Sequence, residues 1–204
     1  MASQPKPYYT PEEYLALERA AEYKSEYLAG EIFAMAGASE AHNTLAVHIV
    51  RLLDTQFQGR PCRVYMSDMR VRVSRAGLYT YPDVVAVCGP REFADDHHDT
   101  LLNPTVIFEI LSPSTEAYDR GEKFAQYWRL PSLTDYVLVA QDRARVEHFT
   151  RQGDGWFVTA ASTLDDALRL ASVDVELPLA AIYENIEFPP SAAEPPSDAR
   201  PTPS

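Results

Sequence analysis

Residues 106–111, VIFEIL, decide the fold of this chain, because they read as an apolar strand interrupted by one charged residue, Glu109. A second apolar run, VVAV, occupies residues 84–87, and a third, YVLVA, occupies residues 136–140. Continuous apolar runs of this length are typical of strands that are covered on both faces. We therefore predict that these segments form the middle of a β-sheet.

Helices are expected on either side of these strands. Thr10, with Glu13 at the third helical position, predicts the start of a helix that reaches about residue 19. Apolar residues at helical spacing predict a second helix over residues 39–58, and a third is expected over residues 115–129. Strands with helices between them indicate an α/β (α+β) fold, with a single mixed β-sheet flanked by helices in one domain.

The domain is expected to cover residues 8–188. Residues 1–7 are predicted to be a flexible N-terminus. Residues 189–204 hold six of the sixteen prolines, with Ser, Ala and Asp between them, which predicts a disordered proline-rich tail.

Composition limits the class of protein. The chain has 204 residues, of which 46% are hydrophobic and 24% charged. This is enough to bury a core without disulfides or a structural metal, and it excludes disordered, collagenous and coiled-coil proteins. The formal net charge is −12. Such a chain is not expected to coat nucleic acid nonspecifically, because that requires clustered Lys and Arg to neutralise phosphates.

Cys62 and Cys88 are the two cysteines, and neither has a Cys or His partner at a zinc-like spacing. We predict that both are reduced core residues of a cytoplasmic protein. The first nine residues lack the apolar run of a signal peptide, and no stretch of 18 apolar residues occurs. No membrane partner is therefore expected.

Charged residues occur at positions where a packed sheet does not tolerate unpaired charge. Asp83 stands at the start of an apolar strand, and Glu109 shares an apolar strand face with Ile107 and Leu111. A buried carboxylate is costly, so it should be paired, protonated or bound to a metal. Lys123, on the predicted third helix, is expected to lie over the ends of these strands.

Two carboxylates and a lysine at strand ends predict a site for a hard divalent cation, Mg²⁺ or Mn²⁺. Asp83, Glu109 and the backbone carbonyl of Ile110 would hold the metal. Lys123 would orient a metal-bound water and offset charge in the transition state of phosphodiester hydrolysis. The spacing is equally compatible with a structural interpretation, in which Asp83 caps a strand end and Glu109 pairs with Lys123 or an arginine.

One motif is quite specific: residues 109–115, EILSPST, are followed by Asp119 and Lys123. Together with residues 9–15, 26–32, 81–85 and 135–139, His42 and Tyr127, this pattern resembles the Uma-type family of restriction endonucleases, a branch of the PD-(D/E)XK nuclease superfamily. The resemblance covers nearly the whole domain. It implies a restriction endonuclease-like fold and a Mg²⁺-dependent endonuclease that hydrolyses DNA phosphodiester bonds, with Asp83, Glu109 and Lys123 as catalytic residues.

One position departs from the wider superfamily. Leu111 stands two residues after Glu109, where the superfamily has its lysine. This position is also apolar in the Uma-type family, and the resemblance implies that Lys123 replaces that lysine from the next helix, which its long side chain allows. Two alternatives stay open: a catalytically silent nuclease fold that binds DNA or protein as an accessory of a mobile element, and a metal-dependent phosphodiesterase acting on RNA or nucleotides.

Glu26, His42 and Tyr127 are candidates for the same site. Glu26 would place a further carboxylate on the metal or next to it. In the alternative interpretation, Glu26 is only a solvated residue of a strand. His42 is a candidate general base or phosphate contact, although a lone histidine on a helix is more often packed and hydrogen-bonded. Tyr127 would hydrogen-bond the site or, alternatively, only pack against the sheet.

Residues 51–75 are locally basic, with six arginines against two acidic residues. The alternation of residues 69–73 places Arg70 and Arg72 on the solvent face of a strand, and we predict that both are weak DNA contacts. In the alternative interpretation, Arg70 and Arg72 lie on an ordinary solvated face of the sheet and do not contact DNA. DNA is the expected partner, and a homodimer would suit an enzyme that cuts both strands.

Overall fold

The computed structural model describes residues 7–74 and 77–189. Most of the predicted flexible N-terminus and nearly all of the predicted disordered tail lie outside the described residues, so the domain limits stay predictions. The predicted α+β class is confirmed. The strands form three sheets, however, rather than the single sheet that we expected.

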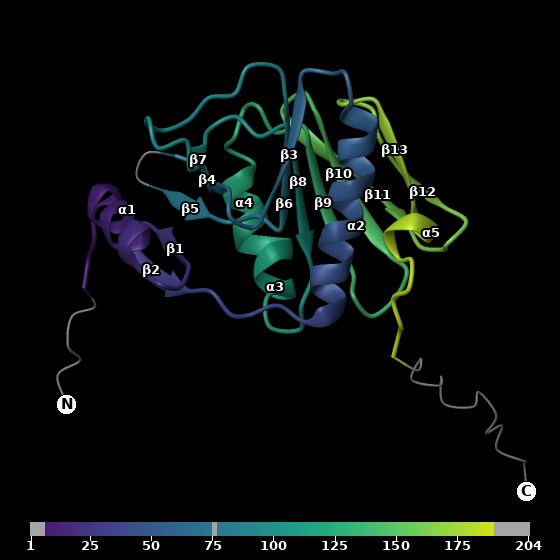
Figure 1. Cartoon of the computed structure of the whole chain (residues 1–204), viewed down its shortest axis with the longest axis horizontal. Helices are drawn as coiled ribbons and strands as arrows, with labels where there is room; N and C mark the ends of the chain where they lie inside the picture. Colours follow the sequence, from purple (N-terminus) through teal and green to yellow (C-terminus); the bar gives the residue numbers. More distant parts are fainter. Residues whose placement is uncertain (1–6, 75–76, 190–204) are drawn as a thin grey trace, which may run out of the picture.

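A mixed sheet of six strands forms the centre of the molecule (Figure 1). β8 and β9 are parallel, and the other neighbouring strands are antiparallel. In spatial order the strands are β11 (Gly155–Ala161), β10 (Val146–Gln152), β9 (Asp135–Val139), β8 (Val106–Ile110), β6 (Val84–Cys88) and β3 (Cys62–Met66). The three apolar runs of the sequence are therefore adjacent strands in the interior of this sheet.

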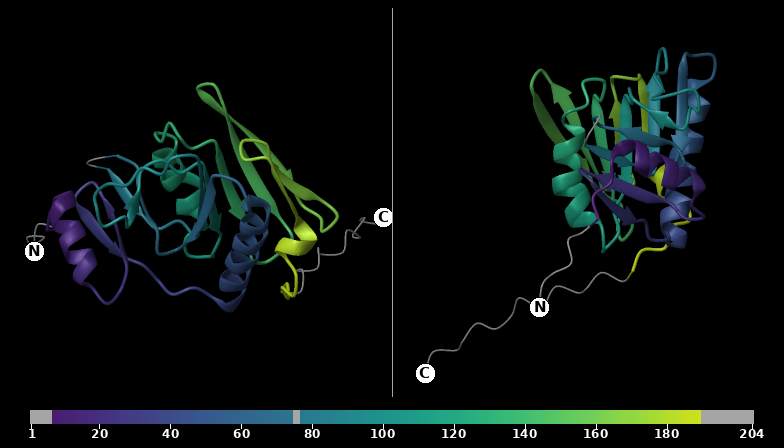
Figure 2. Two further views of the ribbon diagram at one scale, coloured as in Figure 1. Left: turned by 45° about the horizontal axis from the view of Figure 1, so that its top comes forward. Right: turned by 90° about the vertical axis from the view of Figure 1, so that its left-hand side faces the viewer.

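Helical segments cover both faces of this sheet, as the right-hand view of Figure 2 shows. One face packs against α2 (Glu40–Phe57), the hairpin of β12 (Ala167–Leu170) and β13 (Val175–Pro178), and α5 (Leu179–Ile182). The other face lies under α3 (Glu116–Tyr118), the π-helical turn η1 (Asp119–Lys123) and α4 (Phe124–Tyr127). No helix in the described part of the chain is both long enough and apolar enough to cross a membrane.

A second sheet of short strands lies beside the first, with α1 (Pro11–Ala20) near it (Figure 1). Its spatial order is β2 (Glu31–Ala34), β1 (Ser25–Leu28), β5 (Leu78–Thr80), β4 (Arg70–Arg72) and β7 (Thr100–Leu101). Tyr14, Tyr27 and Tyr79 form its small aromatic core. Pro82 separates β5 from β6 and has no N–H to donate to a strand ladder, so it interrupts the pairing where the chain passes between the two sheets.

The prediction that both cysteines are reduced is wrong for this structure, because Cys62 and Cys88 form a disulfide. The two residues lie directly opposite each other in the antiparallel pair β3–β6, with their Cα atoms 4.0 Å apart. Strand register brings them together, and a sequence separation of 26 residues gives no sign of it.

Candidate active site

The carboxylate of Glu109 is the centre of the candidate site. Glu109 lies in β8 and is only 3% exposed. Because side chains alternate along a strand, it shares the α4 side of the sheet with Ile107 and Leu111, as the sequence predicted. The structure brings Lys123 to it: the Nζ atom of Lys123 lies 2.9 Å from Oε1 of Glu109.

Lys123 lies among three carboxylates that come from different elements. Besides Glu109, its Nζ atom lies 3.5 Å from Oε1 of Glu26 in β1 and 3.6 Å from Oδ1 of Asp119, one turn earlier in η1. The lysine itself is 5% exposed and Asp119 is 3% exposed. At the junction of the two larger sheets, acids therefore outnumber cations around this one ammonium.

The helix over residues 116–127 presents these side chains to the sheet. Asp119, Lys123 and Tyr127 recur at intervals of four residues, and all three are buried. The middle turn is π-helical, a local widening that is often found at functional sites. The carbonyl of Asp119 accepts a hydrogen bond of 2.9 Å from the buried hydroxyl of Tyr136, which ties this turn to β9.

Two buried hydroxyl groups hold the carboxylates in place. The hydroxyl of Tyr127 donates a hydrogen bond of 2.8 Å to Oε1 of Glu109, so the predicted contact of Tyr127 with the site is present. The hydroxyl of Thr80, at the end of β5, donates to Oε1 of Glu26. Glu26 is therefore a half-buried partner in the site and not the solvated strand residue of the alternative interpretation.

Asp83 lies at the edge of the same site. Its Oδ2 atom accepts a hydrogen bond of 2.7 Å from the backbone N–H of Ile110 and lies 3.1 Å from Nε2 of His42. Asp83 thus adjoins the residue that follows Glu109. The Nδ1 atom of His42 is buried and has no hydrogen-bond partner within the described structure.

The electrostatics of the site follow from burial and from the excess of acids. Burial raises the pKa of the Glu109 carboxyl, and the ammonium of Lys123 opposes this shift. Burial alone would lower the pKa of Lys123, but the carboxylates of Glu109, Glu26 and Asp119 outweigh it and raise that pKa well above its ordinary value. Burial also raises the pKa of Asp119. Lys123 is therefore a permanent ammonium.

The donor atoms suit a hard divalent cation in their chemistry. Asp83 and Glu109 offer carboxylate oxygens from neighbouring strands, and Mg²⁺ is often bound through one or two carboxylates with water completing its shell. Within the described ranges, no group of three or more His, Cys, Asp or Glu side chains is already arranged around a common point. The site therefore fits a cation held by two carboxylates and water, and not one enclosed by protein ligands.

The predicted DNA contacts receive a correction. Arg70 is 3% exposed, because α1 and residues 95–99 cover the face of β4 that we expected to meet solvent. Its guanidinium donates to the hydroxyls of Tyr81 and Thr100 at 3.0 and 3.3 Å. Arg70 is thus an internal residue. Arg72 is partly exposed, and its DNA contact stays a prediction.

Two residues of the site were not predicted from the sequence as site residues. Asp119 stands four positions before Lys123, the spacing that places two side chains on one face of a helix, so a signal was available. Thr80 gives no such signal, because it comes from the second sheet and meets Glu26 only through the pairing of β1 with β5.

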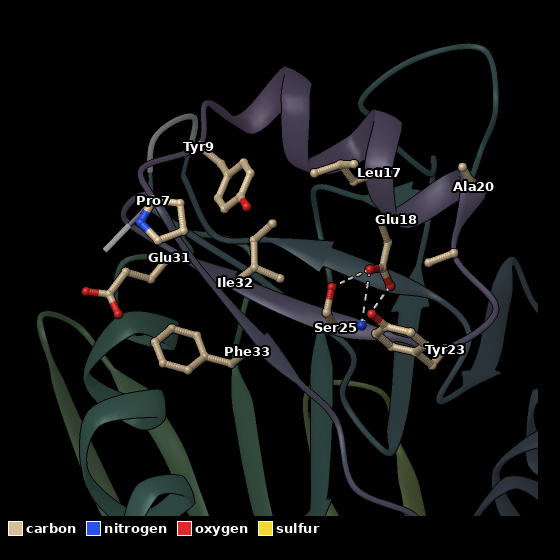
Figure 3. A pocket seen from close by; sticks show the side chains of 11 residues that line it. Pro7, Tyr9, Leu17, Glu18, Ala20, Tyr23, Ser25, Glu31, Ile32 and Phe33 are labelled. Carbon is tan, nitrogen blue, oxygen red and sulfur yellow. Dashed lines mark hydrogen bonds between the residues drawn. The ribbon is translucent and has the colours of Figure 1, made fainter. Parts of the chain in front are cut away.

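A groove of about 730 Å³ lies elsewhere, between α1 and the β1–β2 hairpin (Figure 3). Its wall includes Leu17, Ile32 and Phe33, with the carboxylate of Glu18 at its base. Ser25 donates to Glu18 from its backbone N–H at 3.0 Å and also from its hydroxyl, so this acid is already satisfied by the protein. The groove contains none of Asp83, Glu109 and Lys123.

The architecture is that of a nuclease fold. It is similar to the crystal structure of a "putative nuclease belonging to DUF820" from Anabaena variabilis, with a TM-score of 0.71. The match covers 86% of this chain and 97% of that protein at 18% sequence identity, which establishes a shared fold.

The chain belongs to the Uma2 family, whose model carries the description "Putative restriction endonuclease" and matches residues 11–180. The resemblance inferred from the sequence is therefore confirmed. Two relatives come from Synechocystis sp. and are named as uncharacterized proteins. The protein slr1290 is 35% identical over 186 residues, covering 91% of this chain and 97% of the relative. The protein sll1609 is 38% identical over 151 residues, covering 74% and 85% respectively.

Proposed function

We propose that this protein is a divalent-metal-dependent endonuclease that hydrolyses DNA phosphodiester bonds, with Mg²⁺ or Mn²⁺ as its cofactor. The observation that carries the proposal is the buried ammonium of Lys123, 2.9 Å from Glu109, beside an acid at the start of the adjacent strand, Asp83. Membership in a family described as restriction endonucleases supports the same chemistry.

Asp83, Glu109 and the backbone carbonyl of Ile110 would hold the metal. When bound, the metal lowers the pKa of a coordinated water and neutralises charge on the phosphate. The backbone N–H of Ile110 fixes the orientation of Asp83, and the hydroxyl of Tyr127 fixes that of Glu109. Both acids are therefore oriented by the protein before any ligand arrives.

Lys123 is proposed to act on the attacking water and on the phosphate of the substrate. Its ammonium is preserved by the surrounding carboxylates, so it keeps a full positive charge at neutral pH. A fixed charge in a buried site can orient the attacking water and stabilise the negative charge that develops on phosphorus-bound oxygens. Glu26 and Asp119 also lie close to this ammonium, at 3.5 and 3.6 Å.

The direct test is cleavage of supercoiled plasmid in the presence of Mg²⁺ or Mn²⁺. We expect the wild type to nick or linearise the plasmid, and Asp83→Asn and Lys123→Met to be at least about 10³-fold slower, since metal and charge stabilisation of the transition state are worth several kcal/mol. Glu12→Gln is the control, because it removes an exposed acid of α1 outside the site.

Equal cleavage by all four proteins would contradict the proposed site. If the wild type binds Mn²⁺ through Glu109 but leaves DNA intact, DNA is not the substrate, and RNA and nucleotide substrates are assayed next. If calorimetry detects no Glu109-dependent binding of Mn²⁺, the protein is a silent member of the fold.

A further inference from the structure

One edge of the six-stranded sheet lacks the features that normally protect a strand edge. β11 pairs with β10 on one side, and no other described strand pairs with it. An unpaired strand edge presents a row of free backbone N–H and C=O groups, which is a template for a further strand. In Figure 2 the β10–β11 hairpin lies at the periphery of the molecule, and its tip projects beyond the neighbouring strands.

The other edge strands of the six-stranded and five-stranded sheets, among the described residues, are short or charged. β2 has four residues and includes Glu31, and β7 has only two residues. β3, at the opposite edge of the same sheet, carries the exposed Arg63 within its five residues. Short strands and charges are the usual protection against edge-to-edge pairing. β11 differs from all of them.

β11 is seven residues long, and its sequence GWFVTAA contains neither a charged residue nor a proline. Phe157 and Val158 are 55% and 50% exposed, and as consecutive strand residues they project to opposite faces of the sheet. A new strand at this edge would therefore cover apolar side chains on both faces. The chain has a net charge of −12, but β11 itself carries no charged side chain that would repel β11 of a second copy.

We propose that β11 is the dimer interface of this protein, pairing antiparallel with β11 of a second copy. Antiparallel pairing is self-complementary, because a two-fold axis brings each donor of the strand to the matching acceptor of the other copy. Val158 is the central residue of β11, so an axis beside it places Val158 opposite itself and Phe157 opposite Thr159 of the second copy. Aromatic and β-branched cross-strand pairs of this kind stabilise sheets.

The dimer would join two six-stranded sheets into one continuous sheet. The proposal rests on the strand edge alone and is independent of the nuclease activity. It is tested by sedimentation velocity and by light scattering on the full chain, over a concentration series that extends to 100 µM. We expect a species of twice the 22.9 kDa chain mass.

Val158→Lys is expected to weaken dimerisation at least about 100-fold, because it places two ammonium groups opposite each other at the axis. Val47→Lys is the matched control: Val47 lies on α2, is 52% exposed, and should leave the dimer intact. Thermal unfolding of both variants checks that the fold is retained.

A cross-link locates the interface independently of any loss of stability. The native cysteines are paired with each other, so Val158→Cys introduces a new thiol for a short bismaleimide. We expect a covalent dimer from Val158→Cys and none from Val47→Cys. A monomeric wild type at 100 µM, a dimer that Val158→Lys leaves unchanged, or equal cross-linking of the two cysteine variants would overturn the proposal.

Discussion

Two of the regions in which this protein buries charged side chains satisfy them differently. Around Lys123, three acidic side chains share one ammonium, so acids outnumber cations. Around Arg70, the protein supplies hydrogen-bond partners for the polar groups. The carboxylate of Glu18 accepts hydrogen bonds from Ser25 and from the hydroxyl of Tyr81. The oxygen of that hydroxyl accepts a hydrogen bond from Arg70. We interpret the surplus of acids at the candidate site as suited to a cationic ligand, and the satisfied Arg70 network as structural.

The largest expected effect is on catalysis, with Glu109→Gln. We expect a loss of cleavage activity of about 10³-fold or more, because a metal ligand is removed. We also expect the free energy of unfolding at pH 8 to stay unchanged or to rise, because burial raises the pKa of this carboxyl and opposes its charged form. Plasmid cleavage and urea denaturation measure the two effects.

Arg70→Met should give the opposite result. It leaves the buried network of Glu18 and Tyr81 without its cation, so we expect a loss of about 3 kcal/mol in the free energy of unfolding. Activity per folded molecule should be retained, because Arg70 does not reach the site. The contrast between the two regions is lost if Glu109→Gln destabilises the protein more than Arg70→Met does.

Tyr127→Phe tests whether orientation of Glu109 contributes to activity. We expect kcat to fall about 10-fold, because the hydrogen bond that fixes Glu109 is lost, and stability to fall by about 1 kcal/mol. Tyr183→Phe is the matched control, since its buried hydroxyl donates to the backbone carbonyls of Ala140 and Arg145. Both variants should lose stability, and a similar fall in kcat for both would show that Tyr127 has no specific role.

The smallest expected effect is at Asp99, which borders the Arg70 network. Arg19 donates two hydrogen bonds to Asp99, at 2.8 and 3.0 Å, and these lower the pKa of Asp99 from 3.8 to about 2. A carboxyl with a lowered pKa stabilises the fold above its unfolded pKa, and this stabilisation is lost as the pH falls through the folded pKa. Asp99→Asn should therefore cost about 1 kcal/mol at pH 7, and the difference from the wild type should disappear near pH 2. A difference that is constant from pH 7 to pH 2 would contradict this.

The interior strands and much of the site could be predicted because their signals are local. The apolar runs of β6, β8 and β9 each consist of consecutive residues. Glu109 stands out because it interrupts such a run, and the four-residue spacing of Lys123 and Tyr127 places both on one helix face.

The errors concern information that local sequence does not contain. The alternation of residues along β4 correctly separates the apolar face from the face that carries Arg70. It cannot show that α1, with Arg19, covers the face that carries Arg70 and buries this residue. The pairing of Cys62 with Cys88 depends on register between strands. The contact of Thr80 with Glu26 likewise depends on pairing between β1 and β5.

The disulfide between Cys62 and Cys88 has a consequence for the covalent topology of the chain. It closes a ring that contains Arg70 and Tyr81 of the balanced network and also Thr80 and Asp83 of the candidate active site. A single protease cut between residues 63 and 87 would therefore leave one covalent molecule, whose two pieces migrate separately on a denaturing gel only after a reductant is added. Both buried charge clusters are thus connected through one covalently closed loop.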